Sequence, residues 1–425
     1  MAKHNRGDLQ QMQSLPLEAK IRMTEQRIQG WVESWKRWKI VNKKTGKVRY
    51  ITDTEEPSEK GHWIEDEKNK KQKLVKGTKL KPFEYVDDWE SEMAYVSFSG
   101  GKDSTVLLDI VRKLYPDTEA VFVNTGLEYP SVREFATNTD NVTSVRPSMT
   151  FREVLLKHGY PVISKEIAGK AEEVKKSIEK GKTDTVRYRQ FMGIELKDNG
   201  EKSEYNCDHY KYLLNAPFRV SDKCCDIMKK RTVHQYEKEN GKVPITAIMA
   251  EESRQRKTKW LRYGCNAWEM KHPQSNPMSF WKENDVLQYI YENNLQIAKA
   301  YGNVVLDKKK CKFNTTGSQR TGCIFCLFGI TADKERIARL QIQEPKLADY
   351  VLRGGEFGED GYWKPSKTGL GYWFVIEWLN THGLDIKYYD YGYQKEYGTP
   401  KTTKLLLNEK IKTRMKRSEK DDSGN

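Results

Sequence analysis

Residues 94–104, Ala-Tyr-Val-Ser-Phe-Ser-Gly-Gly-Lys-Asp-Ser, decide the fold of this chain. The β-prone run Ala94–Phe98 predicts a buried strand, and the residues from Ser99 to Ser104 predict a loop. Apolar side chains then recur at helical spacing from Thr105 to Leu114. A strand, a glycine-rich loop and a helix in this order are typical of an α/β unit whose loop binds a ligand.

Further strands are predicted outward from this unit. The runs Ala120–Val123, Val142–Val145 and Pro244–Met249 are short, apolar and separated by helical patterns. Strands that alternate with helices predict an α/β fold, with an open, mostly parallel sheet and helices on both faces. Ligands of such sheets bind beyond the carboxyl ends of the strands, so the loop after Phe98 and the segment after Val123 should share one edge.

We expect five segments along the chain, with helical extensions at both ends. Pro16 and the helical spacing of Ile28 and Trp31 predict a helix over 16–38. Residues 42–47, Asn-Lys-Lys-Thr-Gly-Lys, indicate a hairpin turn. The segments are an N-terminal helical arm (1–41), a charged insertion with a possible hairpin (42–90), a nucleotide-binding domain (91–260), its cysteine-bearing continuation (261–330), and a helical, aromatic extension with a disordered basic tail (331–425).

The charge of the chain indicates an anionic ligand. The 425 residues have a formal net charge of +15, and the stretches 223–262, 299–320 and 401–425 contain the whole excess. Such stretches bind nucleotide phosphates or a nucleic acid, or form an ordinary solvated surface. No apolar run reaches the roughly 20 residues that span a bilayer, and the polar start of the chain lacks the apolar core of a signal peptide. We therefore expect a cytoplasmic protein without a membrane partner.

The loop from Ser99 to Ser104 has the composition of a phosphate cradle. Gly100 and Gly101 lack the Cβ atoms that would block close approach, so backbone N–H groups and the following helix N-terminus can face an anion. Lys102 adds a positive charge, and Asp103 could hold Mg²⁺. The hydroxyls of Ser99 and Ser104 can donate to phosphate oxygens.

The string Ser-Gly-Gly-Lys-Asp-Ser at 99–104 resembles the PP-loop of the ATP pyrophosphatases. The similarity is to the branch that contains phosphoadenosine phosphosulfate (PAPS) reductases and the small subunit of ATP sulfurylase. Enzymes of DNA phosphorothioation and tRNA thiolation are also related, and the ATP-using sulfur-transfer members are the closer match. Three further stretches resemble motifs of this branch, in the expected order: Thr125–Pro130, Ala250–Arg254 and Arg320–Cys323.

The resemblance implies that ATP or a related adenine nucleotide binds with Mg²⁺ at the strand edge. A substrate nucleophile attacks the α-phosphorus, pyrophosphate leaves on Mg²⁺, and a second nucleophile, often sulfur, displaces AMP. Arg254 and Arg320 are then candidates for neutralising the charge that develops on the phosphates, beside Lys102 and Asp103. The further nucleotide-contacting candidates are Thr125, Gly126, Glu128, Glu252 and Ser253.

Seven cysteines, an odd number, favour reduced thiols. Cys323 and Cys326 form a CxxC pair, and Cys224–Cys225 forms a second pair, which together indicate a metal site. These four resemble the set that holds a four-iron four-sulfur cluster in bacterial adenosine phosphosulfate (APS) reductases, and zinc is the alternative. Cys265 could replace Cys224 as a ligand, or could carry sulfur as a catalytic thiol. We interpret Cys207 and Cys311 as ordinary unligated cysteines.

The position of the last cysteine limits the choice of function. The reductases carry a nucleophilic cysteine near the C-terminus, and here no cysteine follows Cys326. We therefore expect a PAPS reductase-like enzyme that couples ATP-dependent adenylation to sulfur transfer or nucleic-acid modification. Its expected partners are a sulfur donor such as a cysteine desulfurase, or thioredoxin, and DNA or tRNA. The alternatives are a PAPS or APS reductase that uses a non-standard thiol such as Cys265, and a non-catalytic regulator that binds nucleotides or nucleic acid.

Overall fold

The contacts within the chain divide it into two compact units in the computed structural model. The structure describes residues 4–51, 62–66, 71–75 and 79–393. Unit 1 consists of Met1–Asn124, Glu128–Arg146 and Val233–Thr321, and unit 2 of Thr125–Leu127, Pro147–Thr232 and Gly322–Asn425. This division differs from the five consecutive segments that we expected, because the helices after residue 147 group with the C-terminal part of the chain.

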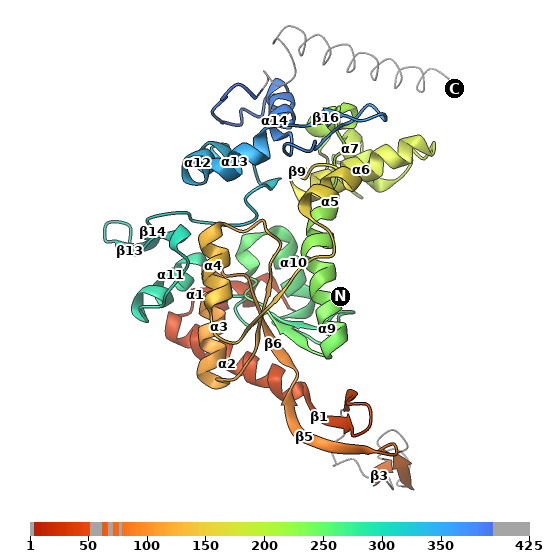
Figure 1. The fold of residues 1–425 in the computed structure, drawn as a ribbon, viewed down its shortest axis with the longest axis vertical. Coiled ribbons are helices and arrows are strands. Elements are labelled where there is room, and N and C mark those ends of the chain that lie inside the picture. The colour runs from red at the N-terminus through yellow and green to blue at the C-terminus, as the bar shows by residue number, and fades with distance from the viewer. Residues whose placement is uncertain (1–3, 52–61, 67–70, 76–78, 394–425) are drawn as a thin grey trace. The chain divides into compact units, whose positions relative to one another are not determined.

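Unit 1 is built on a six-stranded sheet with the order β11-β12-β10-β6-β7-β8. Figure 1 labels its central strand β6. All neighbouring pairs are parallel except the edge pair β11 and β12, which is antiparallel. This arrangement confirms the expected α/β fold with a mostly parallel sheet. The strands are β6 (Ala94–Phe98), β7 (Ala120–Val123), β8 (Val142–Val145), β10 (Val243–Ile245), β11 (Asn266–Ala267) and β12 (Gln274–Ser275).

The central strand β6 is buried on both faces, because alternate side chains of a strand point to opposite sides of a sheet. Ala94, Val96 and Phe98 pack into the large core with the helices of one face. Tyr95 packs on the other face, with Val121 of β7 and Tyr236. The helices of unit 1 that follow its N-terminal arm are α3 (Lys102–Leu114), α4 (Pro130–Asn138), α9 (Arg231–Asn240, which begins in unit 2), α10 (Arg254–Tyr263) and α11 (Glu283–Glu292).

The N-terminal arm is part of the core of unit 1. It forms α1 (Arg6–Ser14) and α2 (Leu17–Ser34), and Ile28 and Trp31 of α2 are fully buried. The ammonium of Lys20 lies 2.6 Å from a carboxylate oxygen of Asp285 on α11, and both residues are buried. The indole N–H of Trp281 donates to the hydroxyl of Thr24 at 2.9 Å. The arm is therefore attached by apolar packing and by specific polar contacts.

The expected hairpin in the charged insertion is confirmed. Strands β1 (Lys36–Asn42) and β2 (Val48–Ile51) pair antiparallel, with Val41 opposite Val48. Strand β5 (Glu84–Glu92) pairs with the other edge of β1. A separate hairpin is formed by β3 (His62–Asp66) and β4 (Lys71–Val75), and β13 (Val304–Asp307) with β14 (Lys312–Thr315) is a third. The remainder of 52–78 lies outside the described residues.

Helices are the main regular elements of unit 2. Two short helices meet at Pro345, which begins the second of them, since proline is accommodated in a first helical turn. None of the described helices is long and apolar enough to cross a membrane. The helices are α5 (Phe151–His158), α6 (Lys165–Glu179), α7 (Val186–Met192), α8 (Lys223–Cys225), α12 (Arg336–Gln343), α13 (Pro345–Leu352) and α14 (Tyr372–Thr381), with a 3-10 helix at Asp208–Asn215.

Three features of unit 2 were not expected from the sequence. A π-helix, Asp226–Lys230, separates α8 from α9. Short strands β9 (Val162–Ile163) and β15 (Leu327–Phe328) pair parallel, and β16 (Glu356–Phe357) and β17 (Trp363–Lys364) pair antiparallel. The predicted disordered tail lies outside the described residues.

We predict that Lys20→Met destabilises unit 1 by about 3 kcal/mol, because removing one partner of a buried ion pair leaves the other charge uncompensated. Urea unfolding followed by tryptophan fluorescence measures this change. The control is Arg22→Ala on the same helix, whose side chain is 72% exposed and whose loss should leave the midpoint unchanged. Equal midpoints for Lys20→Met and the parent chain would show that the ion pair contributes nothing.

Candidate nucleotide site and cysteine centre

The loop between β6 and α3 can be built only from glycine at its centre. Gly100 has φ of 68°, and a Cβ atom there would lie 2.8 Å from the carbonyl oxygen of Val132 in α4. A Cβ atom at Gly101 would lie 3.2 Å from the hydroxyl oxygen of Tyr301. The backbone is thus held close to its neighbours, and the N-terminus of α3 stays free of side chains on the loop.

The two serines of the loop brace its backbone. The hydroxyl oxygens of Ser99 and Ser104 lie 3.0 Å apart. Ser104 Oγ donates to the carbonyl of Gly101 at 2.9 Å, and Ser99 Oγ accepts from the N–H of Gly101 at 3.3 Å. The sequence predicted these hydroxyls as phosphate donors, and the structure shows that they also hold the loop in shape.

Lys102 is buried, with 3% of its surface exposed, yet it remains charged. Its ammonium lies 3.0 Å from a carboxylate oxygen of Asp103 and 3.3 Å from one of Glu283, the first residue of α11. Burial alone would lower the pKa of Lys102, but Asp103 and Glu283 outweigh it and raise the pKa above its ordinary value. Glu283 was missed by the sequence analysis, because it lies 181 positions after Lys102 and has no motif around it.

Arg256 on α10 is half-buried, and the exposed Arg320 and the carboxylate of Asp103 in the loop are near enough to act on its charge. Burial, and then the positive charge of Arg320, lower the pKa of Arg256, whereas Asp103 acts in the opposite direction. Arg256 also pairs with the carboxylate of Glu252. Arg254, the arginine expected here, is exposed at the first position of α10. The sequence Arg-Gln-Arg at 254–256 offered two candidate arginines. Residues two positions apart on a helix differ by more than half a turn, so their side chains point in different directions.

The other predicted nucleotide contacts lie in two places. Ser253 caps α10 by accepting from the N–H of Arg256 at 3.3 Å, and Glu128 is half-buried in unit 1. Thr125 and Gly126 group with unit 2, where Thr125 Oγ1 accepts from the N–H of Leu127 at 3.1 Å. Gly126 has φ of 73°, and a Cβ atom there would have no described atom within 4 Å.

The four predicted metal-binding cysteines gather in unit 2. Burial first, and then the thiols of Cys225, Cys323 and Cys326, raise the pKa of Cys224 well above its ordinary value. Burial and Cys323 likewise raise the pKa of Cys326, to about 12. The two pairs are therefore neighbours in space although 98 positions separate Cys225 from Cys323.

Local structure positions each cysteine pair. Cys224 and Cys225 end α8 directly before the π-helix, a feature often found at functional sites. The CxxC turn is closed by the N–H of Cys326, which donates to the carbonyl of Cys323 at 3.1 Å. Within the CxxC turn, the N–H of Ile324 donates to the carbonyl of Leu127 at 2.8 Å. The segment after β7 is thus hydrogen-bonded to the CxxC turn.

A buried hydroxyl faces this group of cysteines. Tyr372 is fully buried, and its hydroxyl has no hydrogen-bond partner among the residues that the structure describes. Burial, and then Cys326 and Cys224, raise the pKa of Tyr372, so its hydroxyl is a neutral donor near the thiols. An unpaired buried donor costs about 1–3 kcal/mol, which indicates that an acceptor belongs at this position.

The remaining three cysteines are Cys265 and Cys311 of unit 1 and Cys207 of unit 2. Cys265 belongs to unit 1, where it is 7% exposed and packs in the large hydrophobic core. Burial raises the pKa of Cys265, which disfavours its reactive thiolate form. Cys207 is buried, and Cys311 is exposed on the turn between β13 and β14. The burial of Cys265 favours a core role, and its predicted catalytic role stays a prediction.

The family model of the phosphoadenosine phosphosulfate reductase domain matches residues 93–186 and 173–326, which is more than half of the chain. The chain belongs to the phosphoadenosine phosphosulfate reductase domain family. The match begins one residue before β6 and ends at Cys326, so it includes the phosphate loop and both cysteine pairs of this family member.

Two individual proteins are also similar to this family member. An uncharacterized protein of Methanocaldococcus jannaschii is 41% identical over 69 residues, which are 15% of this chain and 17% of the relative's length. The crystal structure of a PAPS reductase from Candida auris, in complex with phosphate, is 17% identical with a TM-score of 0.26. That comparison covers 49% of this chain and 75% of the reductase.

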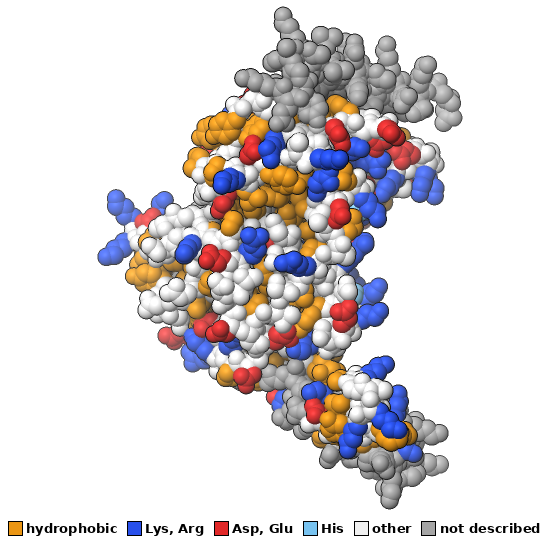
Figure 2. Space-filling view, in the orientation of Figure 1, with side chains coloured by type: hydrophobic (Ala, Val, Ile, Leu, Met, Phe, Trp, Pro, Cys, Tyr) orange, Lys and Arg blue, Asp and Glu red, His pale blue; other side chains and the backbone are white. Residues whose placement is uncertain are grey.

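The positive charge of the chain is partly neutralised at its surface. Figure 2 shows Lys and Arg side chains interspersed with Asp and Glu side chains on the face in view. Within the basic stretch 223–262, Arg231 pairs with Asp226 at 2.9 Å, and Arg256 pairs with Glu252. The basic stretch 401–425 lies outside the described residues. Part of the positive charge of the stretch 223–262 is therefore neutralised by paired carboxylates.

We predict that iodoacetamide modifies the exposed Cys311 of the native chain at least about 10-fold faster than the buried Cys265 or Cys207 at pH 7.5, because burial blocks access to both thiols and raises their pKa. Peptide mass spectrometry after timed quenching measures the three rates, and urea-unfolded chain supplies the control in which they converge. If Cys265 of the native chain is labelled as rapidly as Cys311, its thiol is accessible, and this prediction is wrong.

Proposed function

We propose that this protein binds ATP·Mg²⁺ at the phosphate loop and adenylates a substrate with release of pyrophosphate. A second nucleophile, which is sulfur in a thiolation reaction, then displaces AMP from the adenylated substrate. In nucleic-acid modification this substrate is DNA or tRNA. The observation that carries this proposal is the gathering of Lys102, Arg256 and Arg320 with Asp103 around a loop in which only glycine fits. Lys102, Arg256 and Arg320 can bind the oxygens of a triphosphate, and Asp103 can hold its metal ion. Glu283 and Glu252 pair with Lys102 and Arg256 and fix their positions.

Each residue of this group has a defined role in the proposal. Lys102 and the N-terminus of α3 hold the phosphates, while Asp103 holds Mg²⁺, which shields their charge. Arg256 and Arg320 neutralise the charge that develops on the departing pyrophosphate. Glu283 keeps Lys102 charged and fixes its position from α11. The cradle at Gly100 and Gly101 brings the backbone N–H groups close to the phosphate oxygens.

We further propose that Cys224, Cys225, Cys323 and Cys326 hold a four-iron four-sulfur cluster. In a tetrahedral zinc site the sulfur atoms lie roughly 3.8 Å apart, given zinc–sulfur bonds of about 2.3 Å. Among the described residues, no three of these sulfurs lie within 4.8 Å of one another. The unpaired hydroxyl of Tyr372 is a donor for the sulfur atoms of a cluster.

The surroundings of the cysteines also fit a cluster that carries negative charge. Lys229 lowers the pKa of Cys224, and Lys165 and Lys229 lower that of Cys225, although burial outweighs them in both thiols. When bound, a cluster of this kind supplies an iron site for sulfur or a path for electrons. The hydrogen bond between Leu127 and Ile324 connects its CxxC turn with the loop that follows β7.

The experiment for the nucleotide chemistry follows pyrophosphate released from ATP by anaerobically purified full chain, with DNA or tRNA and a cysteine desulfurase supplied with cysteine. We expect release that requires an acceptor. Arg256→Ala should lower the rate about 100-fold, as the loss of one group that stabilises transition-state charge does. Lys102→Ala should weaken ATP binding about 10- to 100-fold, since a hydrogen bond to a charged group contributes about 1.5–3 kcal/mol.

Matched controls come from the same two helices. Arg262→Ala on α10 and Lys113→Ala on α3 remove exposed cations and should leave both quantities unchanged. Tight ATP binding without pyrophosphate release from any acceptor would instead support a regulator. Sulfite production from PAPS or APS with thioredoxin, lost in Cys265→Ser, would replace the proposal by a reductase.

The cluster is tested separately by the iron and acid-labile sulfide bound per chain after anaerobic purification. We expect a brown protein, loss of iron in Cys323→Ser, and retention of iron in Cys311→Ser, which removes an exposed cysteine. Circular dichroism of both variants shows whether they fold. A colourless chain that contains zinc, or an unchanged iron content in Cys323→Ser, would contradict the cluster without affecting the nucleotide site.

A further inference from the structure

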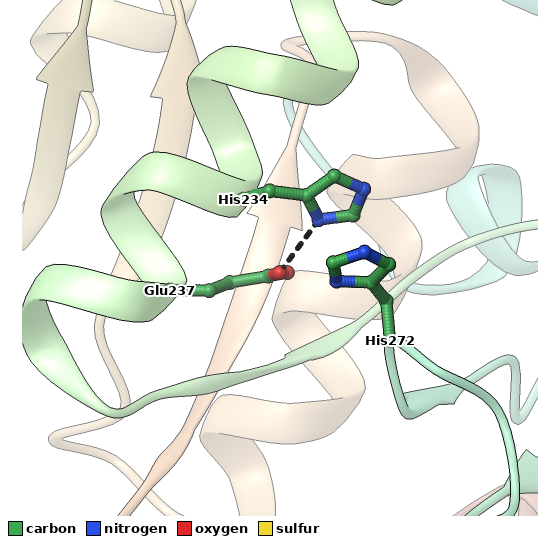
Figure 3. Close-up of side chains that lie close together, drawn as sticks. All are labelled: His234, Glu237 and His272. Atoms are coloured by element: carbon green, nitrogen blue, oxygen red, sulfur yellow. Dashed lines mark hydrogen bonds and ion pairs between the residues drawn. The ribbon is translucent and has the colours of Figure 1, made fainter.

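Two histidines and a glutamate of unit 1 meet at a place that neither the nucleotide site nor the cysteines use. His234 and Glu237 lie one turn apart on α9, and His272 lies in the connection between β11 and β12 (Figure 3). Their ligating atoms all lie within 4.8 Å of one another. Among the described residues, this is the one group of three or more such side chains that satisfies this distance.

The geometry directs nitrogen atoms toward a carboxylate. His234 Nδ1 lies 2.9 Å from an oxygen of Glu237. The two imidazole rings stack with their centroids 3.7 Å apart and an angle of 17° between them. Figure 3 shows a ring nitrogen of each histidine on the side of the Glu237 carboxylate. Two neutral imidazoles and a carboxylate are the donor set that transition metal ions such as zinc prefer.

A neighbouring tyrosine fixes the carboxylate. The hydroxyl of Tyr95 donates to the second oxygen of Glu237 at 3.0 Å. Tyr95 is fully buried on β6, so its position is set by the sheet. A hydrogen bond that orients a ligating carboxylate from behind is a recurrent feature of metal sites in proteins.

The group lies at the sheet edge opposite the phosphate loop. Tyr95 is the second residue of β6, whereas the loop follows its last residue. His272 precedes β12, which runs parallel to β10 and therefore has its amino end on the same side. This edge is separate from the carboxyl edge at which α/β folds bind nucleotides.

We propose that His234, Glu237 and His272 form a binding site for a divalent transition metal ion, with zinc as its probe. On binding, the two rings turn from their stacked arrangement so that one nitrogen lone pair of each, in the plane of its ring, points at the ion beside the carboxylate oxygen. Water completes the coordination, since His272 is exposed. The bound ion joins the β11–β12 connection to α9. The ion thereby stabilises the antiparallel pair β11 and β12 at one side of the sheet.

The test compares zinc binding by the full chain and by variants that all retain the seven cysteines. Isothermal titration and bound zinc after gel filtration should give one site fewer in His272→Ala. The zinc affinity of the remaining sites should be unchanged. The affinity of the altered site should fall about 100-fold or more, because changing even a residue that orients a ligand lowers metal affinity about 10–100-fold. Glu237→Gln should have the same effect. His209→Ala, which removes an exposed histidine of unit 2, should have none.

Cobalt distinguishes this site from the cysteines. Cobalt bound by thiolates absorbs strongly through sulfur-to-metal charge transfer, and cobalt bound by nitrogen and oxygen does not. We expect His272→Ala to lower the cobalt stoichiometry while the charge-transfer band is unchanged. His272 is exposed, so this variant should fold, and its circular dichroism checks that it does. Equal zinc and cobalt stoichiometry and affinity in the parent chain and in His272→Ala would overturn the proposal.

Discussion

The close approach of the β6–α3 loop to its surroundings is the constraint on which the rest of unit 1 depends. The backbone at Gly100 lies so near the carbonyl of Val132 that a single added carbon would be 2.8 Å from it. This contact fixes α4 against the start of α3, and it leaves the helix N-terminus open to an anion. Lys102 is buried directly after the turn, and therefore requires the carboxylates of Asp103 and Glu283. The charged group of the candidate site follows from this one packing constraint.

The sheet could be predicted from the sequence because its strands are short apolar runs that are bounded by turn residues. The bounds of β6, β7 and β8 are as predicted, because local composition specifies these strands, including β8, which lies at the edge of the sheet. Strands β11 and β12 could not be predicted. Each has two residues, and their pairing depends on tertiary contacts such as the hydrogen bond between Ser275 and Asn266.

The candidate sites were predictable to the extent that their residues form local motifs. The phosphate loop and the CxxC pair are contiguous, so their residue types and spacing are visible in the chain. Glu283, Tyr372 and the group of His234, Glu237 and His272 are brought together only by folding. Arg256 was not singled out, because its place on the half-buried side of α10 depends on the direction of its side chain. The role of Arg254 stays a prediction.

The path of the chain has a consequence for any attempt to study one unit alone. The short segment Thr125–Leu127 groups with unit 2, although the residues on both sides of it group with unit 1. The chain passes between the units there and again after Arg146, Thr232 and Thr321. No uninterrupted stretch of sequence therefore encodes either unit. Both must be completed from segments far apart in the chain. Ending the chain at any position from Thr125 to Arg320 therefore removes residues of both units, and synthesis cannot finish one unit before beginning the other.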